Sequence, residues 1–174
     1  MTATMSEPLV DTMNEEPRWG EIDLPGLAER AARATLVDQE LDPAQWEISL
    51  LGCDDARIAV LNADFRGKPT PTNVLSWPAQ DLASEEDGGE PWFPEPFVPG
   101  EREGLGDIAI SFDTCAREAA AAGKPMADHV VHLIVHGVLH LLGYDHIRDG
   151  DAALMEETEV RILAQLGILN PYEI

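Results

Sequence analysis

The chain has 174 residues, which fits one domain, and its hydrophobic content of 44% argues against global disorder. Its 33 acidic residues against 11 basic ones give a net charge of −22, which excludes nucleic-acid binding through a bulk positive field but permits a local phosphate site. The longest apolar stretch, residues 130–142, is interrupted by three histidines and is shorter than the ~20 residues that a membrane-spanning helix needs. Two cysteines make no disulfide framework, and the first 20 residues lack the pattern of a secretory signal. We therefore expect a cytoplasmic protein with no membrane partner.

Two acidic segments stand apart from the rest of the chain. Residues 1–30 and 81–103 together contribute −12 of the net charge. We expect residues 1–20 to be a flexible acidic segment and residues 21–174 to form the domain. Within that domain, the four prolines between 91 and 99 predict a long acidic loop at about residues 79–104 that stays out of the sheet interior. The loop's aromatic residues, Trp92, Phe93 and Phe97, suggest that part of it packs against the domain.

Apolar periodicity and punctuation by Gly and Pro predict the elements between these segments. In chain order we expect a helix over 25–40, a strand over 46–50, a helix from Asp54 or Asp55 that carries Ile58, Leu61 and Phe65 on one face, a strand over 72–77, a strand around 108–110, helices over 113–122 and 126–142, and a last helix with Met155, Ile162, Leu163 and Leu166 toward the core. Short strands mixed with many helices favour a single α+β domain, in which several helices cover a small mixed β-sheet. The strand order does not follow from these patterns.

All five histidines lie within 18 residues, and four of them, His129, His132, His136 and His140, follow one another at spacings of 3, 4 and 4. On a helix these spacings place the four imidazoles along one stripe. Gly143 then permits a left-handed turn, with positive φ, so that His146 can approach His136 and His140 from outside the helix. Three imidazoles on one ion leave an open position, as in a catalytic zinc site. The pattern therefore predicts one Zn²⁺ per chain, held by His136, His140 and His146.

The same ligand spacing occurs in the metzincin peptidases, whose pattern is His-Glu-x-x-His-x-x-Gly-x-x-His. Where those enzymes place a general-base glutamate, this chain has Gly137. The ligand set is shared, but the machinery for peptide hydrolysis is not.

Residues 136–146 read His-Gly-Val-Leu-His-Leu-Leu-Gly-Tyr-Asp-His, which resembles the signature of the bacterial YbeY family of endoribonucleases and rRNA maturation factors. Residues 61–78, 105–111 and 166–172 also resemble family segments, so that the likeness extends from about residue 46 to 172. The loop after residue 79 is longer and more acidic than in many members. The resemblance implies a YbeY-like metal hydrolase that cleaves single-stranded RNA, with no DNA substrate. It also implies roles in 16S rRNA 3′-end maturation and ribosome quality control, with the rRNA precursor, the ribosome or ribosomal proteins as partners.

Arg66 corresponds to the cleft arginine of that family, and a guanidinium fork suits the charge that develops on phosphate oxygens during RNA cleavage. Arg66 also ends a helix before Gly67, where a cation simply favours the helix dipole. Lys68 follows on the same turn. His132 and Asp145 could contact a metal ligand or the substrate, although Asp145 could equally organise the turn.

Two alternatives to the endoribonuclease remain open at this point. One is a metallopeptidase, against which Gly137 counts. The other is a non-catalytic ribosome assembly factor in which zinc only braces the end of a helix.

Overall fold

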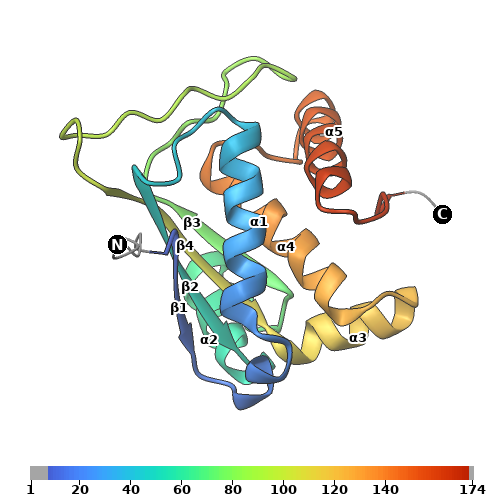
Figure 1. The fold of residues 1–174 in the computed structure, drawn as a ribbon. Helices are drawn as coiled ribbons and strands as arrows, with labels where there is room; N and C mark the ends of the chain where they lie inside the picture. The colour runs from blue at the N-terminus through green and yellow to red at the C-terminus, as the bar shows by residue number, and fades with distance from the viewer. Residues whose placement is uncertain (1–7, 173–174) are drawn as a thin grey trace.

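The computed structural model describes residues 8–172, which form a four-stranded mixed β-sheet with a layer of helices on one face and a single helix on the other (Figure 1). The strand order is β1-β2-β4-β3. The first three strands in this order are parallel, and β3 pairs antiparallel with β4. The strands are β1 (Val10–Asn14), β2 (Trp46–Cys53), β3 (Val74–Pro78) and β4 (Glu103–Ser111). The helices are the 3-10 helix η1 (Pro17–Ile22), α1 (Leu24–Asp38), α2 (Asp55–Arg66), α3 (Phe112–Ala122), α4 (Met126–Leu141) and α5 (Asp149–Gln165).

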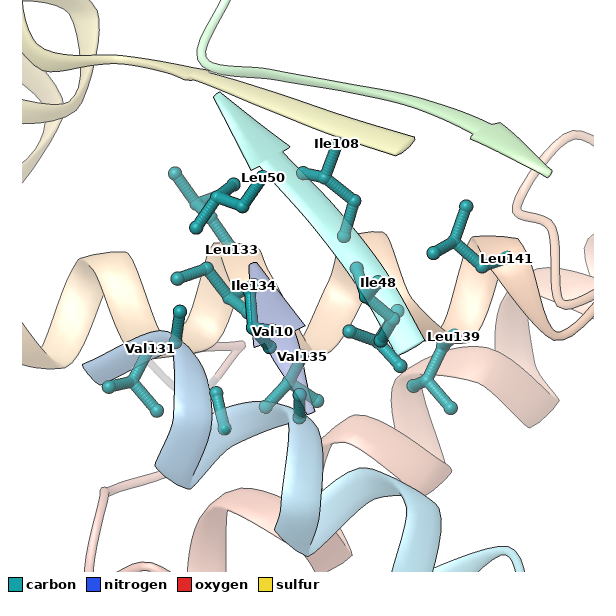
Figure 2. Close-up of a cluster of buried hydrophobic side chains, with 14 of the residues drawn as sticks. Val10, Ile48, Leu50, Ile108, Val131, Leu133, Ile134, Val135, Leu139 and Leu141 are labelled. Atoms are coloured by element: carbon teal, nitrogen blue, oxygen red, sulfur yellow. The ribbon is translucent and has the colours of Figure 1, made fainter. Parts of the chain in front are cut away.

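Alternating side chains of the central strands serve the two faces of the sheet. On one face, Ile48, Leu50 and Ile108 pack against α1 and α4 in the main core (Figure 2). On the other face a smaller cluster contains Ala109 of β4 and Ile58 of α2. The face that carries α4 is the more apolar one, and this packing anchors the helix that bears most of the histidines.

This architecture confirms the prediction of a single domain with a small mixed sheet covered by helices. Most predicted helices begin and end within two residues of the observed bounds, since local signals mark them: Asp54 caps α2, and Gly123 ends α3 with φ of 66°. One detail is wrong. Phe65 does not share the buried face of Ile58 but is 49% exposed at the end of α2, edge-on to Trp77. No helix within residues 8–172 is long and apolar enough to cross a membrane.

The N-terminal segment differs from the prediction. Residues 1–7 lie outside the described part of the chain, but residues 10–14 form the edge strand β1, and Leu9 and Trp19 are fully buried. The carboxylate of Glu29 on α1 accepts hydrogen bonds from the backbone NH groups of Leu9 and Val10. Residues 8–20 are therefore part of the domain. Two adjacent apolar residues make too short a pattern to reveal a strand whose partner, β2, lies more than 30 residues away.

The acidic loop also differs in part. Its last two predicted residues, Glu103 and Gly104, already pair with β2 as the start of β4. Part of the loop does pack against the domain, as predicted, but not through its aromatics, because Trp92, Phe93 and Phe97 are 60–85% exposed. The residue that does bury is Leu82, which is 6% exposed. Local composition identified the loop, but which of its side chains faces the domain depends on contacts with distant residues.

Gly143 has the predicted positive φ, at 102°. A Cβ at this position would lie 2.7 Å from the backbone carbon and oxygen of Leu82. We therefore expect Gly143→Ala to lower the free energy of unfolding by more than the about 1–3 kcal/mol that a left-handed non-glycine residue costs. Gly167→Ala is the control, because Gly167 has φ of 77° with nothing near its Cβ position. Urea denaturation of the two variants measures the difference, and equal losses would contradict the close approach of Leu82.

Candidate metal centre

Helix α4 places His136 and His140 one turn apart on the same side. Their ring centroids are 4.5 Å apart and their Nε2 atoms face each other at 3.0 Å. The rest of α4 explains this orientation, because Val135, Val138 and Leu139 on neighbouring positions are fully buried in the core. The two imidazoles are therefore held at the edge of the core with their Nε2 atoms toward a common point.

His146 reaches the same point from outside the helix. After α4 ends, the turn through Gly143 brings the ring of His146 to 5.3 Å from that of His136 and 5.1 Å from that of His140. One nitrogen of each of the three rings lies within 4.8 Å of the other two, so that the three histidines could hold a metal ion. Within residues 8–172, no other histidine, cysteine or carboxylate joins this cluster. The His146 side chain is 56% exposed, so this group of histidines borders the solvent.

The protonation state of His140 suits the binding of a cation. Burial, together with the nearby rings of His136 and His146, lowers the pKa of His140 to about 4. The imidazole of His140 is therefore neutral at pH 7, with a lone pair available for a metal. Imidazole nitrogen is a donor that suits Zn²⁺ as well as other first-row metals.

Glu159 of α5 is a functional residue that the sequence analysis missed. It is fully buried, and its Oε1 accepts a hydrogen bond from Nδ1 of His136. Burial alone would raise the pKa of Glu159, but hydrogen bonds from His132 and His136 outweigh this effect and lower the pKa to about 2. The ionised carboxylate keeps the proton of His136 on Nδ1, which leaves Nε2 free to bind a metal. A signal was present, since Glu159 falls between Met155 and Ile162 on the apolar stripe of α5.

We expect Glu159→Gln to weaken metal affinity by about 10–100-fold, because a neutral amide no longer fixes the proton of His136 on Nδ1. The matched control is Glu118→Gln, since Glu118 pairs with His129 at 3.0 Å outside the cluster. Competition with a chromogenic zinc chelator gives the two affinities. Equal affinities would show that Glu159 has no influence on the site.

The two remaining candidates from the sequence, His132 and Asp145, lie near the three histidines. His132 lies with its Nε2 3.5 Å from Oε2 of Glu159, so it faces the metal cluster only through this carboxylate. The hydroxyl of Tyr172 also donates to Glu159. Asp145 accepts a hydrogen bond from the backbone NH of His146 at 2.7 Å, while its carboxylate is 3.8 Å from Nδ1 of that ring. Asp145 therefore organises the turn in this structure.

Arg66 and Lys68 lie in the same cleft as two of the three histidines, His140 and His146. This cleft has a volume of about 900 Å³, and Arg66, Lys68, His140 and His146 all line it. Gly67 between the two cations has φ of 71° and ends α2, so the helix-end features are present as well. Neither Arg66 nor Lys68 has an ion-pair partner among residues 8–172, although the chain is strongly acidic. Two cationic side chains without a carboxylate partner, in the same cleft as His140 and His146, can bind a phosphate group.

Comparisons with known proteins point to one family. The family described as Endoribonuclease YbeY matches residues 12–167. Endoribonuclease YbeY of Ruegeria pomeroyi is 67% identical over 163 residues, which cover 94% of this chain and 97% of the relative. Endoribonuclease YbeY of Dinoroseobacter shibae is 60% identical over 164 residues, covering 94% and 90%. The solution structure of TM1509 from Thermotoga maritima has a similar fold, with a TM-score of 0.53 and 15% identity over 95% of this chain and 99% of that one.

Proposed function

The chain belongs to the YbeY family of endoribonucleases, and from this premise we propose that it is a zinc-dependent endoribonuclease specific for single-stranded RNA. We propose further that it acts in the cytoplasm, in 16S rRNA 3′-end maturation and in ribosome quality control. The observation that carries the proposal is the cleft lined by Arg66, Lys68, His140 and His146, in which the last two belong to the group of three convergent histidines.

In this mechanism His136, His140 and His146 would hold the ion. When bound, zinc supplies Lewis acidity, which makes water more acidic and polarises a phosphoryl oxygen. Arg66 binds the scissile phosphate through its guanidinium fork and stabilises the negative charge that grows on the phosphate oxygens in the transition state. Lys68 adds a second cation from the same turn. Glu159 keeps the proton on Nδ1 of His136 throughout, so that Nε2 of this ring stays oriented toward His140.

The charge of the cleft shapes how RNA reaches it. Arg66 and Lys68 are offset by two carboxylates in the lining, Asp81 and Asp145. A divalent ion at the histidines makes the cleft net positive, while the molecule as a whole carries −22. Long-range attraction to RNA is therefore weak, and we propose that the ribosome or its proteins present the RNA to this cleft.

The structure counts against the peptidase alternative. Gly137, at the position of the metzincin glutamate, packs against β4, and a Cβ there would lie 3.2 Å from Cδ1 of Ile108. This position faces the core and has no room for a general base. The second alternative, a zinc-braced assembly factor, predicts metal binding without cleavage.

One experiment separates the three functions. The zinc-loaded protein is incubated in parallel with an unstructured RNA, a duplex RNA and casein, and the chelator-treated protein serves as the control. We expect cleavage of the unstructured RNA alone, and its loss on chelation. Cleavage of casein would favour the peptidase, and a zinc-loaded protein that cleaves none of the three substrates would favour the assembly factor.

A further inference from the structure

The segment that delivers His146 has little structure of its own. Residues 142–148 lie between the end of α4 and the start of α5, outside any helix or strand. The backbone NH of His146 donates to the carboxylate of the adjacent Asp145, which is itself 43% exposed. His136 and His140 are fixed by a helix in the core, whereas the position of His146 must be set by contacts of this short segment.

Tyr144 supplies some of those contacts, since it is 8% exposed and its hydroxyl donates to Gln39 at 2.7 Å, and the acidic loop supplies the others. Residues 82–88, which we call the strap, contact the chain before and after His146, in the segment 142–148 and in the first turn of α5. On one side, the backbone of Leu82 lies against Gly143 so closely that a Cβ there would be 2.7 Å away. On the other side, the backbones of Gly88 and Gly150 come together, with a Cβ at Gly88 only 3.5 Å from Cα of Gly150.

Arg148, two residues after His146, forms the main connection. Its guanidinium donates to three successive carbonyls of the strap, those of Ser84 at 2.8 Å, Glu85 at 3.0 Å and Glu86 at 3.4 Å. Its Nε also donates to Asp151 at 2.6 Å. Three carbonyls in a row form an acceptor for the planar guanidinium fork that a lysine ammonium matches poorly.

Asp151 and Asp87 complete the connection with two further hydrogen bonds. The carboxylate of Asp151 accepts from the backbone NH of Gly88 at 2.9 Å, and the carboxylate of Asp87 accepts from the backbone NH of Asp151 at 2.9 Å. The strap is internally bonded as well, through the NH of Gly89 to the carbonyl of Glu86 at 3.0 Å. The strap is therefore an ordered element that can hold the segment bonded to it in place. Leu82 and Ala83 at its start also line the cleft that contains Arg66.

We propose that Arg148 is a positioning residue, which docks the strap onto the segment 142–148 and thereby holds His146 in place for metal binding. This gives part of the acidic loop a function inside the domain. The inference rests on the proposed metal site, to which it adds the device that keeps the third ligand in reach.

The test compares Arg148→Ala with Arg161→Ala. Arg161 is a matched control, because it lies on α5, is about as exposed as Arg148 (50% against 42%) and forms its own ion pair, with Asp38 at 2.8 Å. Zinc affinity is measured by chelator competition, and amide hydrogen exchange is followed in the strap and at residues 142–148. We expect Arg148→Ala to weaken zinc binding at least about tenfold, the lower end of the effect of losing a partner that orients a ligand.

In Arg148→Ala, the amide hydrogens of Gly88 and of the residues around His146 should exchange faster than in the wild type. In Arg161→Ala, their exchange rates should not change. Arg148→Lys should restore part of the affinity. Asp151→Ala, which breaks the other half of the connection, should weaken zinc binding in the same direction, and the double variant should lose less than the sum of the two.

Wild-type zinc affinity in Arg148→Ala, or an equal loss in Arg161→Ala, would overturn the proposal. A wild-type protein that binds no zinc would contradict the metal site itself. In that case the hydrogen-exchange comparison still decides whether the strap holds residues 142–148, and unchanged exchange in Arg148→Ala would overturn the proposal on that ground.

Discussion

His140→Ala is expected to abolish stoichiometric zinc binding, reducing the metal content from about one ion per chain to near zero. Removal of one of three imidazoles leaves two donors, and the loss should exceed the about 10–100-fold that follows from removing an outer partner such as Glu159. Cleavage of single-stranded RNA should disappear with the metal. Elemental analysis of the purified variant and of wild-type protein measures the first effect, and a cleavage assay measures the second.

His129→Ala is the control for that experiment. His129 lies on the same helix, but its Nε2 pairs with Glu118 at 3.0 Å and it does not belong to the metal cluster. The His129→Ala protein should therefore bind zinc as the wild type does.

In the wild-type protein, acidification should weaken zinc binding, since an imidazole must be unprotonated to coordinate. A fully metallated His140→Ala protein would contradict the ligand set.

Arg66→Ala is expected to lower single-turnover cleavage by about 10²–10³-fold, the usual effect of removing one donor that stabilises charge in the transition state. Zinc content and melting temperature should stay near those of the wild type, because Arg66 has no ion-pair partner to lose within the described residues. Arg66→Lys should recover only part of the rate, since an ammonium cannot make the bidentate contact with phosphate.

The helix-end role of Arg66 predicts the opposite pattern. If Arg66 only favours the helix dipole, Arg66→Ala would lower the free energy of unfolding by about 0.3–1 kcal/mol. Arg66→Lys would then restore this stability in full, and cleavage per folded molecule would not change in either variant. Arg57→Ala on the same helix is the control, since Arg57 pairs with Glu15 at 3.2 Å and does not line the cleft. Normal cleavage by Arg66→Ala would remove Arg66 from the catalytic groups and leave the histidines as the remaining support for catalysis.

Much of the metal centre was predictable because its geometry is local. The spacing of His136 and His140 sets their relation through the pitch of one helix, and the turn at Gly143 depends on a glycine that tolerates φ of 102°. The bounds of α2 and α3 were predictable for the same reason, since caps such as Asp54 and Gly123 act within a few residues. The cleft arginine needed the family resemblance, because a cation before a helix-ending glycine is equally typical of an ordinary helix end.

Other parts depended on partners far away in the chain. The strand β1 depends on two distant partners. Val10 pairs with Ile48 of β2, and the carboxylate of Glu29 accepts hydrogen bonds from the backbone NH groups of Leu9 and Val10. Phe65 is 49% exposed and lies edge-on to Trp77, a contact between two elements that periodicity along α2 alone did not reveal.

The amino-acid sequence by itself determined the helices, the mixed α+β character and the three histidines that converge on one point, since these follow from backbone propensity and from spacings of a few residues. The tertiary structure alone decided that Glu159 contacts His136 from 23 residues away, that Arg66 shares a cleft with His140 and His146, and that Arg148 bonds to the backbone of Ser84. The physical reason is that a buried hydrogen bond between distant residues is made only after the core has packed α4, α5 and the sheet against one another.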